Sequence, residues 1–183
     1  MEQNASRVMT IILSLWVLGL AGCGCKPGPD RHPVVVKLEG FEDSPAIDVH
    51  IIAKNKSESP RWENYSMGSY WRPGDPVREG TGDDQRYVMH FGPGKPTTQS
   101  FSPKDTPKDW ERLWKKWESQ RATKLFILAF LPGDPARPFE DRPGSLDPRR
   151  RVLPLDRCRW NKKQQTIRCV LKSDSIEVLT PPK

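Results

Sequence analysis

The sequence is poor in the residues that usually build a hydrophobic core. After residue 22, Leu, Ile, Val and Phe account for 31 of 161 residues, just below the share at which disorder becomes a fair expectation. The net charge of +7 is small for this length, so self-repulsion is weak. Each tryptophan can also bury about 150–250 Å², and six follow residue 22: Trp62, Trp71, Trp110, Trp114, Trp117 and Trp160. We therefore expect one folded domain with long polar loops.

The sequence also lacks the short motifs of common catalytic and cofactor sites. No Gly-x-Ser-x-Gly elbow and no His-Glu-x-x-His helix occurs. Gly94-Lys95 departs from a phosphate-binding loop, which needs glycine where Met89 stands and a hydroxyl residue where Pro96 stands. The histidines are scattered, and the acidic pair at 83–84 has no partner at calcium-loop spacing. We expect no catalytic residues, no metal site and no cofactor, although the paired carboxylates of a hydrolase would leave no sequence motif.

No apolar run reaches the roughly 20 residues needed to cross a bilayer. The run from Val8 to Leu20 instead has the length of a signal-peptide core. It leads into Leu20-Ala21-Gly22-Cys23, which resembles the lipobox of bacterial lipoproteins. This resemblance implies cleavage before Cys23 and a lipid, with acyl chains such as palmitate, on its sulfur. An uncleaved anchor helix and a plain secretory signal are the alternatives.

The lipobox divides the chain into a predicted signal peptide (1–22), a flexible tether rich in glycine and proline (23–32) and a single domain (33–183). Gly24, rather than aspartate, follows the cysteine, which favours the outer membrane facing the periplasm. The predicted partners are the membrane, through the N-terminal lipid, and a protein, but not nucleic acid. The basic charge suits anionic head groups or an acidic partner, and it also suits plain solubility.

Short apolar segments bounded by turn residues predict an all-antiparallel arrangement of strands. Segment 124–131 is apolar without alternation, which is typical of a strand covered on both faces. Long loops are expected at 72–85, 92–105 and 132–151. The expected strands are 34–38, 47–51, 65–71, 87–91, 124–131, 152–155, 157–160, 166–171 and 176–179. The pattern predicts a mainly β protein, an antiparallel β-sandwich with one helix in a crossover.

That helix is well signalled. Thr106 is a favourable N-cap residue, and Pro107 is favourable at the first helical position. Asp109 lies in the first turn, near the positive end of the helix dipole. Its apolar stripe recurs at helical spacing and consists of Trp110, Leu113, Trp114 and Trp117. We expect the stripe to pack on the sheet. The alternative is a helix that lies among lipid head groups.

Two cysteines suggest a disulfide bond. If residues 157–160 and 167–170 fold about Lys163-Gln164, Cys158 lies opposite Cys169. Opposed Cβ atoms in a hairpin are about 4.5–5.5 Å apart, at the strained limit for a disulfide. An oxidising compartment favours the bond. The alternative is two buried thiols on one inward face.

The densest charge is the triplet Arg149-Arg150-Arg151, which directly precedes the strand expected at 152–155. Guanidinium groups grip carboxylates and phosphates well, so the triplet is a candidate contact for a partner or for lipid head groups. The alternative is a solvated loop end.

The order of parts resembles the outer-membrane lipoprotein family of type VI secretion systems. The matching features are Cys23, the helix before the apolar strand at 125–131, and the closing strands at 166–171 and 176–179. The resemblance implies a transthyretin-like sandwich, or an immunoglobulin-like one, that anchors a secretion apparatus. The sequence as a whole predicts a lipid-anchored cell-envelope protein with a non-catalytic binding or structural role. A secretion anchor, a membrane-surface module and an envelope hydrolase are the alternatives.

Overall fold

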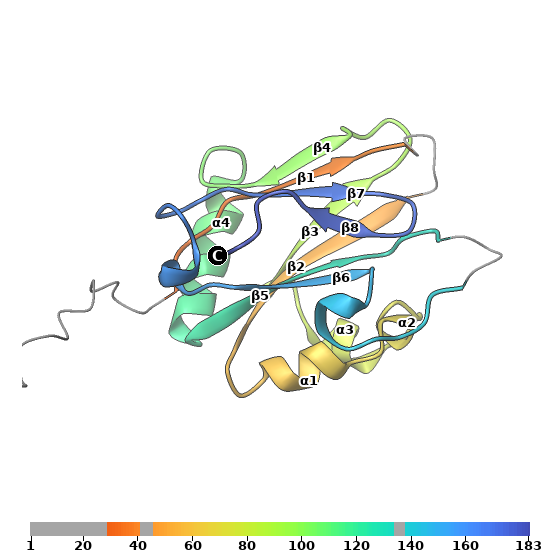
Figure 1. Ribbon diagram of the computed structural model, residues 1–183, viewed down its shortest axis with the longest axis horizontal. Coiled ribbons are helices and arrows are strands. Elements are labelled where there is room, and N and C mark those ends of the chain that lie inside the picture. Colours follow the sequence, from red (N-terminus) through yellow and green to blue (C-terminus); the bar gives the residue numbers. More distant parts are fainter. Residues whose placement is uncertain (1–28, 41–45, 134–137) are drawn as a thin grey trace, which may run out of the picture.

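Figure 1 shows the computed structural model, which describes residues 29–40, 46–133 and 138–183. Its strands form two four-stranded sheets, ordered β4-β1-β7-β8 and β3-β2-β5-β6. The strands are β1 (Val34–Leu38), β2 (Ile47–Asn55), β3 (Arg86–Phe91), β4 (Thr98–Phe101), β5 (Ala122–Ala129), β6 (Arg150–Pro154), β7 (Ile167–Leu171) and β8 (Ile176–Val178). Strands β1 and β7 are parallel, and the other neighbours are antiparallel. The predicted mainly β, sandwich-like arrangement is confirmed, but the β1–β7 pair is parallel where the sequence predicted antiparallel pairing.

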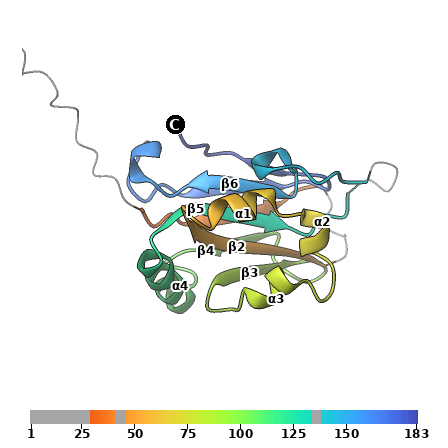
Figure 2. The same ribbon diagram turned by 90° about the horizontal axis from the view of Figure 1, so that it is seen from below.

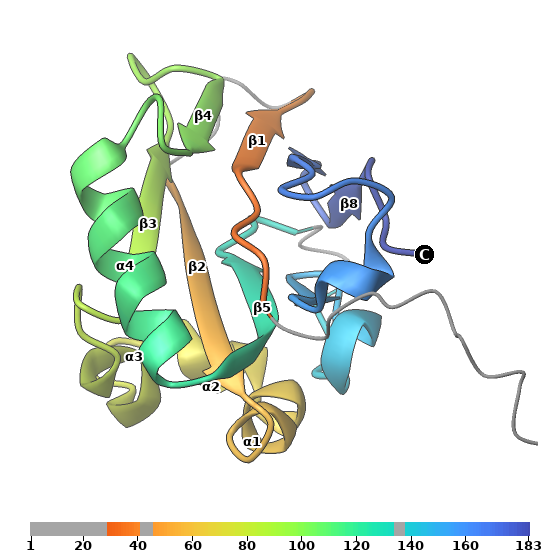
Figure 3. The same ribbon diagram turned by 90° about the vertical axis from the view of Figure 1, so that its left-hand side faces the viewer.

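The main core lies between the two sheets and is closed along one side by helix α4 (Pro107–Ser119), as Figure 3 shows. Trp110, Leu113, Trp114 and Trp117 are each at most 4% exposed. Burial of three tryptophans compensates for the scarcity of aliphatic residues. The stripe therefore packs in the core as expected, and the membrane-facing alternative is wrong.

A second apolar layer covers the outer face of the β3-β2-β5-β6 sheet. Leu125 and Ile127 on β5 join the main core, whereas Phe126 and Leu128 join a second cluster. This cluster is completed by Ile52 on β2 and by the short helices α1 (Ser59–Asn64) and α2 (Met67–Tyr70), which lie along the sheet in Figure 2. Strand β5 is thus covered on both faces, as its continuous apolar pattern predicted.

The strand predicted at 65–71 is wrong, because this segment forms α2. The Ser66 hydroxyl accepts a hydrogen bond from the Ser69 N–H at 2.9 Å and caps the helix. Met67 and Tyr70, three residues apart, then face the sheet. The predicted loop at 72–85 also contains helix α3 (Pro76–Gly80), and the one at 92–105 contains β4.

Residues 29–32, which the sequence analysis assigned to the tether, lie on the domain. Pro29 forms an isolated β-bridge with Asp156. The Asp30 N–H donates to the Leu155 carbonyl at 2.9 Å, and His32 is fully buried. The signal peptide and Cys23 lie outside the described residues. Within 29–40, 46–133 and 138–183, no helix has both the length and the apolar character needed to span a membrane.

Candidate functional site

Two members of the arginine triplet, Arg149 and Arg150, are buried, so they lack the exposure that the predicted partner contact requires, whereas Arg151 is half-buried. Arg150 is 1% exposed and donates to four carbonyl oxygens, at 2.5–3.0 Å. These belong to Trp62, Tyr65, Arg142 and Gly144. Burial lowers the pKa of Arg150. The side chain ties α1 and the 62–65 segment to the loop before β6, which is a structural role.

Its neighbours are also committed to this loop. Arg149, 7% exposed, donates to the carboxylates of Asp147 at 2.9 Å and Asp141 at 2.7 Å. Its guanidinium also lies 4.9 Å from the centre of the Phe139 ring. Arg151 donates to the carbonyls of Ser145, Asp147 and Arg150. The triplet therefore fixes residues 138–148, and it leaves Arg149 and Arg150 little surface for a ligand.

The predicted Cys158–Cys169 disulfide is also wrong. Cys169 on β7 is a free, buried cysteine, and burial raises the pKa of its thiol to about 12. The strand expected at 157–160 is instead the 3-10 helix η2 (Arg157–Arg159), because the Asp156 carboxylate accepts from the Cys158 N–H at 3.0 Å. Without that strand, the hairpin register that would oppose the two cysteines does not form.

Strands β2 and β3 together carry a group of titratable side chains. The His90 ring lies 2.7 Å from the Asp48 carboxylate, and the His50 ring lies 2.7 Å from the Tyr70 hydroxyl. They border a hollow of about 400 Å³ that is also lined by Arg86. Burial lowers the pKa of His50 to about 4, so its imidazole is neutral near pH 7.

In an Asp–His pair the carboxylate can orient the imidazole as a general base toward a side-chain nucleophile, a water molecule or a substrate. Among the described residues, the ring of His90 has a hydrogen-bond partner in Asp48 and in no hydroxyl or thiol. Nor do the described residues hold a group of three or more His, Cys, Asp or Glu side chains that could hold a metal ion. This cluster is therefore a polar hollow bordered by a hydrogen-bonded Asp–His pair.

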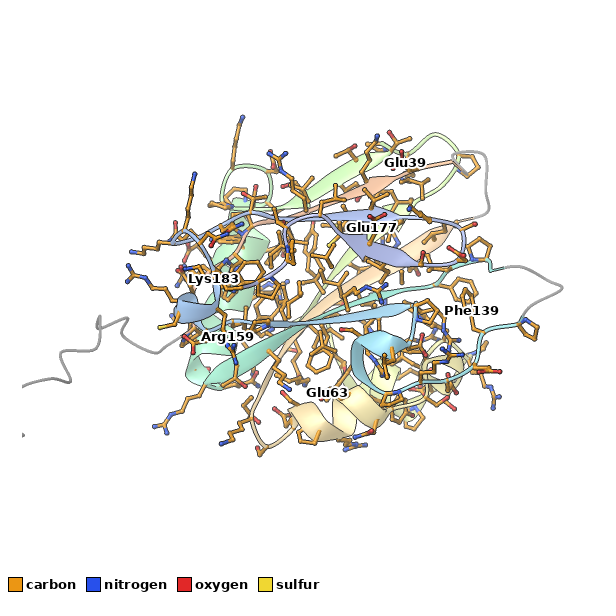
Figure 4. All side chains as sticks on the ribbon, in the orientation of Figure 1. Glu39, Glu63, Phe139, Arg159, Glu177 and Lys183 are labelled. Atoms are coloured by element: carbon orange, nitrogen blue, oxygen red, sulfur yellow. The ribbon has the colours of Figure 1, made fainter. Side chains whose placement is uncertain are left out.

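Another hollow lies beside Phe139, which Figure 4 shows at the end of the domain opposite to Arg159 and Lys183. Its volume is about 480 Å³, and Pro138, Phe139 and Pro148 form its apolar part. Leu146 on the 3-10 helix η1 (Gly144–Leu146) borders it with 70% of its surface exposed. Glu140, Arg142 and Asp174 supply charges around the apolar centre.

This hollow has a fixed backbone. The Gly133 N–H donates to the Ser173 carbonyl at 2.9 Å, and the Ile176 N–H donates to the Pro148 carbonyl at 2.9 Å. Gly133 has a φ of 69°, and a Cβ there would lie 2.7 Å from the Phe139 ring. Leu146 and Phe139 carry no signal in the sequence, because isolated apolar residues in a proline-rich loop show no periodicity.

The opposite end of the domain carries cations near the first described residues. Arg157, Arg159, Lys162 and Lys163 are all exposed, and none of them forms an ion pair with a described carboxylate. Figure 4 shows Arg159 and Lys183 together at this end. The four cations fall within seven residues, a density that was visible in the sequence.

No family model matches the sequence, and no curated protein matches it. Two solved structures are similar to it in fold. One, described as a type VI membrane complex, has a TM-score of 0.47 and 9% identity, and the match covers 82% of this chain and 98% of that one. The other is the Serratia marcescens protein Lip, described as a membrane-bound component of the type VI secretion system. It has a TM-score of 0.45 and 11% identity, with coverage of 83% and 98%. At these values neither protein's role carries over to this chain.

Proposed function

We propose that this protein is a lipid-anchored component of the bacterial cell envelope that binds a protein partner and catalyses no reaction. The observation that carries the proposal is the placement of the hollow at Phe139 and Leu146 at the end of the domain opposite to Arg159 on η2, the element that follows the Pro29–Asp156 bridge. The anchor and the binding surface would then lie at opposite ends of one rigid sandwich.

The membrane end follows from covalent geometry. Cys23 precedes Pro29 by six residues, and an extended chain spans at most about 3.3–3.6 Å per residue. A lipid on Cys23 would therefore lie within about 20 Å of Pro29. Because Pro29 is bridged to Asp156, the end of the domain that contains η2 would face the membrane.

Mass spectrometry of the N-terminal peptide tests the anchor. We expect the mature protein to begin at Cys23 with a diacylglycerol on its sulfur, and we expect the Cys23→Ala variant to lack that lipid. A mature protein that retains residues upstream of Cys23, or that carries a free Cys23 thiol, would contradict the anchor.

The proposed partner-binding surface is the hollow beside Leu146. Single exposed apolar residues are common, but Leu146 borders a preformed hollow lined by Pro138, Phe139 and Pro148. Such a surface suits an apolar side chain presented by a protein, with Glu140, Arg142 and Asp174 at the rim.

A photo-crosslinking residue at position 146 in the full chain tests this surface in cells. We expect one crosslinked product of defined mass, and none from position 179, where Leu179 is 54% exposed but does not line the hollow. With the crosslinker at Pro138, Leu146→Met should retain the product and Leu146→Ser should weaken it. Equal crosslinking from 146 and 179 would contradict a specific site.

Anchoring of a secretion apparatus at the outer membrane is the more specific alternative. The observation that favours it is the order of α4, the apolar strand β5 and the closing β7–β8 pair after the predicted lipobox. Purification of the lipidated protein from its own membranes would then bring down other components of that apparatus. Purification without any of them would exclude this role.

A further inference from the structure

The segment from Arg157 to Lys163 forms a cationic rim beside the predicted tether. Its members are Arg157, Arg159, Lys162 and Lys163, all of them exposed. The rim adjoins the tether because Asp156, one residue before it, is bridged to Pro29. Acidic groups of this part of the domain are engaged elsewhere: Asp30 accepts from the Gln164 N–H, and Glu63 is paired with Lys124. Asp156 accepts from the Cys158 N–H, and Glu111 and Glu118 are paired with Arg31.

The cationic rim stands on a rigid base. Trp160 is 3% exposed, its indole N–H donates to the Pro154 carbonyl at 2.9 Å, and its ring centre lies 4.6 Å from that of His32. The Gln164 N–H donates to the Asp30 carboxylate at 2.7 Å. The rim is therefore fixed to residues 30–32, the same residues that lead to the tether.

We propose that the cationic rim binds anionic lipid head groups and so orients the domain on its membrane. This rests on the proposed lipid anchor, which would hold Pro29, bridged to the residue before the rim, within about 20 Å of the lipid on Cys23. Each Lys or Arg close to an anionic surface contributes about 1 kcal/mol, and the attraction decays over a Debye length. Four cations on one rigid edge would make one orientation dominant, with the Leu146 hollow directed away from the lipid.

The test uses the full lipidated protein reconstituted in neutral phosphatidylcholine vesicles and in vesicles that also contain phosphatidylglycerol. Acylation of each lysine by a neutral reagent is followed by mass spectrometry. We expect anionic vesicles to slow acylation of Lys162 and Lys163 by at least about fivefold, and added salt to remove this protection. Lys95, an exposed lysine on the β3–β4 loop, is the control whose rate should not change.

Reversing the charge of the two arginines near Lys162 and Lys163 provides a second test. The double variant Arg157→Glu and Arg159→Glu should abolish the protection of Lys162 and Lys163, whereas Arg168→Glu on β7 should retain it. All three positions are exposed, so the fold is expected to persist, as circular dichroism would verify.

The outcomes separate the rim from the anchor. Flotation with neutral vesicles reports the lipid anchor by itself. If the protein floats but acylation of Lys162 and Lys163 is the same on both vesicles, the rim does not bind lipid, and an acidic protein becomes its better ligand. Equal slowing at Lys95 would also overturn the proposal, because it would show a general effect of the charged surface.

Discussion

Arg31 is bound to Glu118 through two parallel hydrogen bonds, with both N···O distances 2.8 Å. Its remaining terminal nitrogen lies 3.0 Å from the Glu111 carboxylate. The two acidic residues stand seven positions apart on α4 and so share one face of the helix. This clamp fastens the chain that follows Pro29 to the helix that closes the core.

Replacing Arg31 with Gln should loosen this connection more than it destabilises the fold. Arg31 and Glu118 are partly exposed, at 28% and 38%, so water screens their attraction and the loss should stay below about 1 kcal/mol. Hydrogen exchange of the 30–32 amides should nevertheless accelerate relative to the β1 amides.

Arg168→Gln is the matched control for the Arg31 variant, because Arg168 is exposed on β7 and lies outside the clamp. It should leave exchange at 30–32 unchanged. Equal acceleration in both variants would mean that α4 does not hold the segment.

Elements that are determined by local sequence patterns could be predicted from the sequence. Strand β5 was predictable because its apolar run has no alternation, and α4 because its cap, proline and stripe agree. The helix begins at Pro107 after Thr106, although the Thr106 hydroxyl bonds to Ser102 instead of capping the helix.

Where distant contacts decide, local reasoning failed. In the sequence, a triplet of arginines has the pattern of a solvated loop end. In the structure, the buried Arg150 donates hydrogen bonds to the carbonyls of Trp62 and Tyr65, which lie more than 80 residues away in the chain. The same limit applies to 65–71, because the outer layer that α2 builds on the sheet exists only in the folded chain. At Cys158, the Asp156 carboxylate caps the 3-10 helix η2, which takes the place of the predicted strand.

Replacing Arg150 with Met should strongly destabilise the protein. Methionine is an unbranched apolar side chain that can occupy part of the space of arginine, but it cannot donate hydrogen bonds. The variant therefore leaves four carbonyl oxygens without their donor. Each buried acceptor left unsatisfied costs about 1–3 kcal/mol, so we expect a total loss above about 2 kcal/mol after partial rehydration.

Urea unfolding measures the Arg150 effect, with Arg168→Met as the control on an exposed site. If both variants unfold at the same urea concentration, the Arg150 network contributes little to stability. Hydrogen exchange would locate the damage: the amides of residues 62–65 and 142–144 should exchange faster in the Arg150 variant, because these segments contain the carbonyls that Arg150 binds.

The buried His50 predicts a dependence of stability on pH. Its pKa is lowered from 6.5 to about 4, first by burial and then by the charge of Arg86. Because the unfolded chain binds a proton near pH 6.5 while the folded chain does not, the stability is complete above that pH and falls as the pH drops toward 4. Burial also lowers the pKa of His32, which adds to the same trend.

Between pH 7 and pH 5, His50 should account for a loss of about 1–2 kcal/mol in the free energy of unfolding. The His50→Gln variant should therefore show a flatter decline over this interval than the parent protein. His90→Gln, which changes the exposed histidine at the same end of the sheet, should keep the steep decline. A His50→Gln curve that falls as steeply as the parent's would mean that His50 does not titrate differently in the folded and unfolded states.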